Sequence, residues 1–486
     1  MDIHGDNRAF DSATLLAADL RDRKIGCVEL LDFFLARAER HNPKLNAIIV
    51  WQIDKARDRA RAADEALAKG QRWGPLHGVP MTVKESFNLA GLPTTFGNPA
   101  WKDNVPAANS VVVDRLQNAG AVIFGKTNVP YMLSDSQSFN DIYGTTNNPW
   151  DVTCGPGGSS GGEAATLAAG MSALGAGSDI AGSLRNPAHY CGVYGHKPTW
   201  GLIPTRGHAP PGVVTPTDIS VVGPMARSAD DLALALGILA GPDALQQAAW
   251  RVQFPAPRGR SLKDFRVAVW GSAPEAPIDD SVAMLFAAAV EAVRKAGAAV
   301  DESARPVELG ENHRLFLRLL RSATAGRLTD EAYAEQVKLA ATLTPDDLSP
   351  RAHVARGATL SHREWGQANE ARSKLRYVWR EFFRRFDVLL APVAATAAYP
   401  HDHNPDFGAR RIIINGEPHS HVDITWAGLA ALSYLPATAA PIGRTASGLP
   451  VGLQIIGPEG EDPTTIEFAR LLAREIGGFT PPPGYE

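Results

Sequence analysis

Two glycine-rich loops of this chain carry serines that could act as nucleophiles. They are Gly157-Gly158-Ser159-Ser160-Gly161-Gly162 and Asp179-Ile180-Ala181-Gly182-Ser183-Leu184-Arg185. Upstream of both, Lys84 ends an apolar stretch, Val79-Pro80-Met81-Thr82-Val83. A hydroxyl is a poor nucleophile until a base takes its proton, and a lysine is a poor base until it loses its charge. Together, the lysine and the serines could supply both halves of that chemistry, with backbone N–H groups free for an oxyanion.

The order lysine, serine, serine and its surroundings resemble the amidase signature family, whose members cleave carboxylic amides through a Ser–cis-Ser–Lys triad. The resemblance runs from about Thr14 to the C-terminus and is densest between Leu76 and Met225. It implies one compact amidase domain over residues 1–486, with the catalytic residues in a signature core at residues 71–230.

The resemblance also implies a role for each motif residue. Lys84, after Gly78-Val79-Pro80 and before Glu85, matches the signature lysine. Ser159 matches the bridging serine, whose bond to the preceding glycine is expected to be cis, and Ser183 matches the nucleophile. The backbone amides expected in the oxyanion hole are those of Ile180, Ala181, Gly182 and Ser183. The expected supporting residues are Ser160, Ser178, Asp179 and Arg185.

Two positions depart from the family pattern. Ala181 stands where the family commonly has glycine. Tyr131 stands where the family often has glutamate, directly after Lys126-Thr127-Asn128-Val129-Pro130. Alanine keeps its amide hydrogen but resists a positive φ. The oxyanion hole therefore requires residue 181 to adopt an ordinary backbone conformation.

The first loop also satisfies the pattern Gly-x-Ser-x-Gly, which is typical of the nucleophile elbow of α/β-hydrolases. That elbow needs a strand immediately before the serine. Residues 147–156 are instead polar and turn-rich, with two prolines. A serine–histidine site using His189, His196 or a C-terminal histidine is an alternative, as is a purely structural role for the glycines.

Strand and helix patterns alternate along the chain, which predicts an α/β fold with a mixed central sheet covered by helices on both faces. Residues 240–260 are predicted to form a surface excursion. The predicted helices are residues 13–20, 28–41, 52–69, 111–118, a buried helix within 164–177, 280–296 and 361–385. The predicted strands are residues 121–124, 174–178, 265–270, 298–300, 387–392 and 451–457.

Composition places the chain among ordinary globular proteins. Its 486 residues are 44% hydrophobic and 21% charged, with a net charge of -4, which gives no reason to expect nucleic acid or an anionic membrane as partner. Three cysteines are too few for a disulfide framework, and neither a signal peptide nor a spanning segment is expected. No metal-binding or phosphate-loop motif appears, so no cofactor is expected. We further expect a cytoplasmic protein that is a monomer or homodimer.

The motif indicates which bond is attacked but not the molecule that carries it. We expect a neutral, fairly hydrophobic amide, with an anilide, carbamate or ester as further possibilities. The alternatives are the catalytic subunit of a glutamine-dependent tRNA amidotransferase and a noncatalytic scaffold of the same fold. The residues expected to line the substrate pocket are Tyr131, Met132, Leu133, Arg206 and Trp426.

Replacing Lys84 with alanine should leave a folded protein whose amidase activity is lower by orders of magnitude, because the base is lost. Circular dichroism would report folding, and hydrolysis of a simple amide would report activity. Full activity in this variant would remove the lysine from the mechanism.

Overall fold

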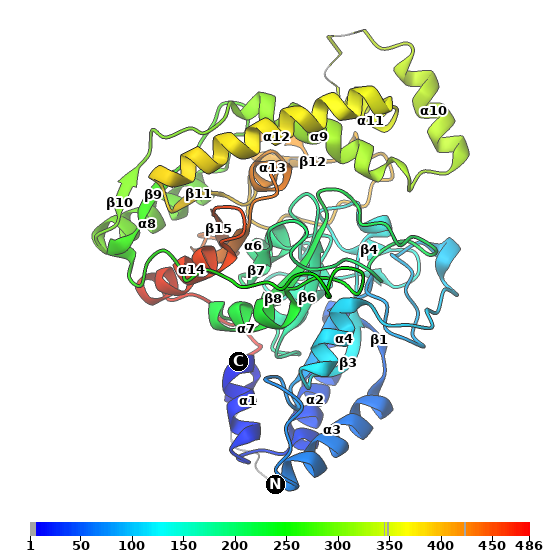
Figure 1. Cartoon of the computed structure of the whole chain (residues 1–486), viewed down its shortest axis with the longest axis vertical. Coiled ribbons are helices and arrows are strands. Elements are labelled where there is room, and N and C mark those ends of the chain that lie inside the picture. The colour runs from blue at the N-terminus through cyan, green and yellow to red at the C-terminus, as the bar shows by residue number, and fades with distance from the viewer. Residues whose placement is uncertain (1–5, 345, 348, 422–423) are drawn as a thin grey trace.

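One large sheet and three small ones contain the strands of the part of the chain that the structure describes (Figure 1). The computed structural model describes residues 6–344, 346–347, 349–421 and 424–486. The strands are β1 (Ile48–Trp51), β2 (Pro80–Lys84), β3 (Val122–Thr127), β4 (Phe139–Asn140), β5 (Gly144–Thr145), β6 (Gly175–Asp179), β7 (Tyr194–Lys197), β8 (Val221–Ala226), β9 (Arg266–Val269), β10 (Ala299–Asp301), β11 (Val388–Pro392), β12 (Arg411–Ile414), β13 (Glu417–Ser420), β14 (Ala437–Arg444) and β15 (Pro450–Ile456).

The large sheet has eight strands in the order β10-β9-β11-β15-β14-β7-β8-β6. β9 pairs in parallel with both β10 and β11. Each later pair in this order, from β11 to β6, is antiparallel. The sheet is therefore mixed, as the alternating sequence pattern predicted.

A separate three-stranded sheet, in the order β1-β3-β2, carries Lys84. β2 runs parallel to β3, and their register places Lys84 beside Thr127. β2 also packs against β6 of the large sheet, and the Thr82 N–H donates to Ser172 Oγ at 3.1 Å, just before β6. The two sheets therefore meet where the lysine strand ends.

Helices cover both faces of the large sheet, so the predicted α/β architecture is confirmed. α5 and α6 pack together against one set of strands, whereas α7, α8 and α14 form a second group (Figure 1). The helices are α1 (Ala13–Arg21), α2 (Cys27–Leu45), α3 (Ile53–Ala68), α4 (Val111–Asn118), α5 (Gly161–Ala168), α6 (Arg185–Cys191), α7 (Ala229–Leu239), α8 (Asp280–Lys295), α9 (Leu309–Ala325), α10 (Asp330–Ala340), α11 (Pro350–Ala358), α12 (His362–Arg385), α13 (Thr425–Leu432) and α14 (Asp462–Ile476).

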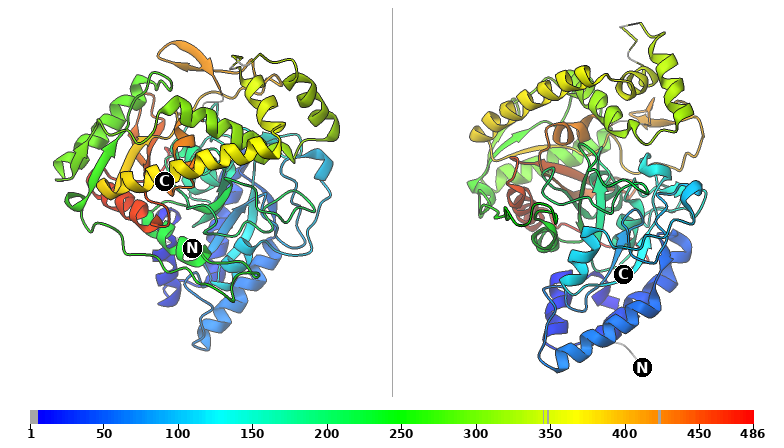
Figure 2. Two further views of the ribbon diagram at one scale, coloured as in Figure 1. Left: turned by 45° about the horizontal axis from the view of Figure 1, so that its top comes forward. Right: turned by 45° about the vertical axis from the view of Figure 1, so that its right-hand side comes forward.

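Six of the remaining helices form two outer groups. α1, α2 and α3 gather at one end of the molecule, and α9, α12 and α13 lie together at the other (Figures 1 and 2). α10 projects away from the body in both figures and buries none of its residues. The C-terminus returns to the first group, where the Tyr485 carbonyl accepts a hydrogen bond of 2.5 Å from Arg37 on α2. No helix among the described residues has the length and apolar character needed to span a membrane.

Two helices, α2 and α5, have a boundary that differs from the sequence prediction by more than one residue. α2 does not stop before Pro43 but continues to Leu45, and the Asn46 N–H donates to the Asn42 carbonyl at 2.7 Å to close its last turn. α5 starts at Gly161 and ends at Ala168 instead of extending through the apolar run. Gly170 adopts a φ of 63° there, and the Met171 N–H bonds back to the Thr166 carbonyl, an arrangement that terminates helices.

Trp379 on α12 is fully buried and stacks on Phe383 with ring centroids 5.7 Å apart. Replacing Trp379 with alanine should lower the free energy of unfolding by about 3–5 kcal/mol, because packing is lost and a cavity remains. Tyr377 on the same helix is 67% exposed, so Tyr377→Ala is the matched control and should have little effect. Urea unfolding of both variants checks this, and equal stabilities would contradict it.

Candidate active site

The Lys84 amine lies among three serine hydroxyls in the interior. Lys84 is the last residue of β2 and is completely buried. Its Nζ lies 2.7 Å from Ser159 Oγ, 3.0 Å from Ser160 Oγ and 2.9 Å from Ser178 Oγ. These serines come from the loop before α5 and from β6, so three separate segments meet at one amine.

The first glycine loop holds its two serines against the lysine. The peptide bond from Gly158 to Ser159 is cis, as the resemblance implied. A Cβ on Gly158 would lie 2.2 Å from the Asp135 carbonyl oxygen, so only glycine fits this close approach. Asn186 joins this loop to the second one, because its Oδ1 accepts a hydrogen bond from the Gly158 N–H at 3.2 Å.

The second glycine loop brings Ser183 beside the first. The Ser183 carbonyl accepts a hydrogen bond of 3.2 Å from the Ser160 N–H. No hydrogen bond joins the side chains of Ser159 and Ser183, both of which lie in the described part of the chain. The structure therefore brings Lys84 and Ser159 into direct contact. Ser183 is linked to this cluster by the backbone hydrogen bond between its carbonyl and the Ser160 N–H.

Ser183 is one of few residues in this region that solvent can reach. From residue 154 to residue 199, all of which the structure describes, every residue is buried except Ile180, Ala181, Ser183 and Asn186. Lys84, Ser159, Ser160 and Ser178 all lie beneath them. The site is thus a closed lysine–serine cluster whose exposed edge is the Ser183 loop.

A buried ion pair anchors this loop. Arg185 donates from Nη2 and Nε to the two carboxylate oxygens of Asp179, both at 3.0 Å. The same carboxylate accepts from the Gly182 N–H at 2.8 Å and from the Leu184 N–H at 3.2 Å. Burial alone would raise the pKa of Asp179, but Arg185 and these donors lower it to about 2, so the carboxylate is ionised.

The Gly182 N–H is therefore already used by Asp179, which bears on the predicted oxyanion hole. Gly182 itself has a φ of 105°, whereas Ala181 is not among the described residues with a positive φ. Ala181 thus has the ordinary conformation that the alanine at this position requires.

Burial is the main cause that holds the pKa of Lys84 well below its usual range. Arg327 lowers this pKa further, whereas Asp179, Glu163 and Glu85 raise it when their carboxyl groups are ionised. A buried amine of this kind sheds its proton at a lower pH than an exposed lysine and can accept one from a neighbouring hydroxyl.

Sequence reasoning did not predict that α9 and α12 contribute to an apolar surface beside the nucleophile loop. Ile180 and Ala181 pack against a cluster, here called the apolar wall, from α9, α12, α13 and neighbouring segments. Long-range packing creates this wall, so no local motif signals it. Its buried members are Ile219, Phe316, Leu319, Leu320, Ala368, Ala431, Leu432 and Tyr434.

The residues predicted to line the pocket fall into different surroundings. Tyr131 is 55% exposed, Met132 is buried and Leu133 is half-buried. Arg206 forms an exposed two-point ion pair with Asp243, with both contacts at 2.9 Å. The ring of Trp426 is buried in the main core, edge-to-face with Trp270.

The serine–histidine alternative does not fit the structure for His189 or His196. His189 places its ring nitrogens 2.9 and 3.0 Å from the carbonyls of Gly452 and Thr396. The ring nitrogens of His196 contact Thr438 and Asp462. No strand directly precedes Ser159 within the described chain, so the nucleophile-elbow interpretation is also excluded.

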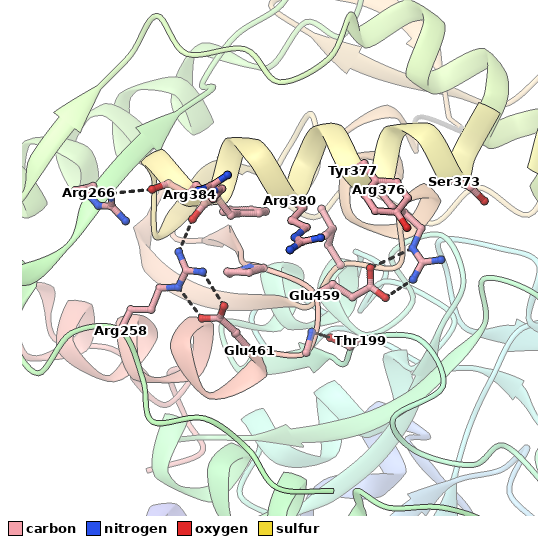
Figure 3. A pocket seen from close by; sticks show the side chains of 14 residues that line it. Thr199, Arg258, Arg266, Ser373, Arg376, Tyr377, Arg380, Arg384, Glu459 and Glu461 are labelled. Carbon is pink, nitrogen blue, oxygen red and sulfur yellow. Dashed lines mark hydrogen bonds and ion pairs between the residues drawn. The ribbon is translucent and has the colours of Figure 1, made fainter. Parts of the chain in front are cut away.

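A groove of about 980 Å³ lies elsewhere, between α12 and the turn before α14 (Figure 3). Several arginines line it, but Arg376 pairs with Glu459, and Arg258 pairs with Glu461. None of the residues that line it belongs to the lysine–serine cluster. We therefore do not assign the chemistry to this groove.

Comparisons with known proteins identify the family of this chain. Residues 29–466 match the family model described as Amidase. The chain is 33% identical over 488 residues to a glutamyl-tRNA(Gln) amidotransferase subunit of Anaeromyxobacter sp. (strain K), covering 96% of each chain. It is 32% identical to an acylamidase of Rhodococcus erythropolis, covering 94% of each.

A solved structure shows the same fold. The crystal structure of a bacterial aryl acylamidase of the amidase signature family superposes with a TM-score of 0.80 and 26% identity, covering 96% of each chain. The chain therefore belongs to the amidase signature family and is an amide-hydrolysing enzyme.

Proposed function

We propose that this enzyme cleaves its amide through an acyl-enzyme on Ser183, with Lys84 as base and Ser159 as the hydroxyl between them. The observation that carries the proposal is the 2.7 Å contact between Lys84 Nζ and Ser159 Oγ beneath a solvent-reachable Ser183. The missing hydrogen bond between the two serines is compatible with it, because such bonds are often longer without substrate.

The hydrogen bonds around Lys84 favour Ser159 as its proton donor. A neutral amine has two N–H donors and one lone pair, so one of the three serines must donate to it. Ser160 Oγ accepts from the Ser178 N–H and lies 3.3 Å from the Ser178 carbonyl, to which it can donate. Neither Ser159 nor Ser178 has such a competing acceptor among the described residues. Of these two, Ser159 belongs to the loop that is hydrogen-bonded to the Ser183 loop, so we assign the proton for Lys84 to Ser159.

The reaction then follows from these positions. Lys84 takes the proton of Ser159, and Ser159 takes that of Ser183, whose Oγ bonds to the amide carbon. The proton returns through Ser159 to the leaving nitrogen as the C–N bond breaks. Water then hydrolyses the ester on Ser183 and regenerates the hydroxyl.

The oxyanion formed on attack needs N–H donors near Ser183. Because Gly182 donates to Asp179, we propose that the N–H groups of Ile180, Ala181 and Ser183 stabilise the oxyanion. Asp179 and Arg185 support the loop, and Ser160 and Ser178 support the lysine.

The apolar wall favours a neutral, fairly hydrophobic substrate, because its buried members border Ile180 and Ala181 at the edge of the site. Likeness to an acylamidase and an aryl acylamidase supports an acyl amide or anilide, with carbamates and esters as further candidates. The five residues predicted from the sequence to line the pocket, and a cytoplasmic monomer or homodimer, stay predictions.

A second candidate function is that of the glutamine-hydrolysing component of a tRNA amidotransferase, which the likeness to such a protein over 96% of both chains favours. Glutaminase activity that appears only with partner proteins would support it. Hydrolysis of simple amides by the isolated chain would support the solitary enzyme. The noncatalytic scaffold that the sequence left open does not agree with the assignment of the chain as an amide-hydrolysing enzyme.

A fluorophosphonate probe should label the wild-type protein on Ser183, because an activated serine attacks phosphorus as it attacks a carbonyl. Mass spectrometry of the labelled peptide identifies the residue, and competition with a small panel of amides, carbamates and esters ranks substrates. Ser183→Ala should abolish labelling. Labelling that persists in this variant would refute Ser183 as nucleophile.

Asp179→Asn should lower the free energy of unfolding at pH 7 by about 3–5 kcal/mol, because it leaves the buried Arg185 without its counter-charge. Asp243→Asn is the matched control, since its exposed pair with Arg206 should be worth about 0–1 kcal/mol. Urea unfolding measures both, and equal losses would contradict the expectation.

The same variant has an expected pH dependence. The pKa of Asp179 in the folded protein is about 2, below the ordinary 3.8. The contribution of ionised Asp179 to the free energy of unfolding is therefore present above about pH 4. That contribution is lost as the pH falls through the folded value. The stability gap between wild type and Asp179→Asn should therefore narrow between pH 4 and pH 2.

A further inference from the structure

The buried carboxyl group of Glu163 lies close to Lys84, and the proposed mechanism does not use it. Glu163 is on α5 and is completely buried. Its Oε1 lies 2.6 Å from Thr82 Oγ1, and its Oε2 lies 2.9 Å from Thr127 Oγ1. A Cβ on Gly175 would lie 2.2 Å from this carboxyl, so glycine at that position leaves room for it.

Strand geometry places these threonines around the lysine. Thr82 is two residues before Lys84 on β2, so their side chains point to the same face. Thr127 on β3 is the registered partner of Lys84. Glu163 therefore hydrogen-bonds to Thr82, two residues before Lys84 on the same strand, and to Thr127, beside Lys84 on the neighbouring strand.

Glu163 and Asp179 have opposite surroundings. Asp179 has an arginine in two-point contact and two backbone N–H donors. Glu163 has two neutral hydroxyls, and no ion pair reaches it from the described residues. Burial raises the pKa of Glu163 to about 8, against the opposing effects of the two threonines and Lys84.

The hydrogen-bond network has a place for a proton on Glu163. If Oε2 carries a hydrogen, it donates to Thr127 Oγ1, and the Thr127 hydroxyl turns to the Val83 carbonyl, 3.5 Å away. Thr82 continues to donate to Oε1. The neutral carboxyl group thus keeps a partner on each oxygen without movement of the backbone.

We propose that Glu163 is a positioning residue that carries a proton at neutral pH and thereby leaves Lys84 uncharged. An ionised Glu163 would stabilise the ammonium form of Lys84 and remove the base. A protonated one fixes Thr82 and Thr127, and with them the end of the lysine strand, without adding charge. This inference rests on the proposed role of Lys84 as base.

The charged and titratable groups on the elements packed against α5 do not change this conclusion. They are Lys84 on β2, Lys126 on β3, Asp179 at the end of β6, and Arg185, His189, Tyr190 and Cys191 on α6. Of these, Lys84 is the one that acts on Glu163 by its charge. Asp179 and Arg185 neutralise each other.

Infrared difference spectroscopy tests the protonation state without reference to activity. Subtracting the Glu163→Gln spectrum from wild type at pH 7 should reveal the carbonyl band of a protonated carboxylic acid. Glu459→Gln, which changes a surface carboxylate paired with Arg376, is the matched control and should reveal a carboxylate band instead. A carboxylate band lost from Glu163→Gln would overturn the proposal.

The acidic limb of the kcat/KM profile gives an independent test. If Glu163 is neutral, Glu163→Gln replaces one neutral group by another, and the midpoint of the limb should stay where it is. If Glu163 is ionised, its removal takes an anion from beside Lys84, and the midpoint should fall by about 1–3 pH units. Such a fall would overturn the proposal.

Further variants separate positioning from a merely structural role. Glu163→Leu, which cannot hydrogen-bond to the threonines, should lower kcat with little change in KM, and Glu163→Gln should restore part of that loss. If Glu163→Gln does not fold, Thr127→Val should shift the protonated carboxyl band and Thr127→Ser should not. Absence of both the protonated carboxyl band and its shift in Thr127→Val would overturn the proposal. If the band is present but the fluorophosphonate probe does not label Ser183, only the proposed function is refuted.

Discussion

The site depends on keeping the amine of Lys84 away from water and among hydroxyl groups. A lysine in solvent holds its proton at neutral pH, whereas burial disfavours the ammonium form. Lys84 Nζ contacts Ser159, Ser160 and Ser178 and is closed to solvent. Those contacts satisfy the amine without a counter-ion in the hydrogen-bonding shell.

Two sheets are needed to build that environment. Lys84 ends a strand of the three-stranded sheet, whereas Ser178 lies on an edge strand of the eight-stranded sheet. The loop with Ser159 and Ser160 fills the junction, and close backbone contacts at Gly158 allow it to do so. A displacement of β2 against β6 would therefore separate the base from its serines.

The carboxyl groups around the site divide between two functions. Asp179 is ionised and directs its charge to Arg185 and to the amides of the nucleophile loop. Glu163 is surrounded by hydroxyls and joins the strands that carry Lys84 and Thr127. One carboxylate thus gives the loop its shape, and the other group holds the lysine strand with little effect on the charge of the site.

The sequence by itself determined the order of lysine and serines, the α/β class and many element positions. These features are local: Ser12 and Ser110 cap α1 and α4 directly before residues 13 and 111, where the predicted helices begin, and the glycines mark both loops. Its errors were also local, at Pro43 and at the end of α5, where single hydrogen bonds decide a boundary.

Only the tertiary structure decided how these parts meet. It placed Glu163 between Thr82 and Thr127, which are 45 residues apart in the sequence but close together on the paired strands β2 and β3. It also directed the Gly182 N–H to Asp179. Finally, it placed the apolar wall beside Ile180. Each of these depends on contacts between segments distant in the chain, and sequence periodicity reports only which face of an element is apolar, not what packs against it.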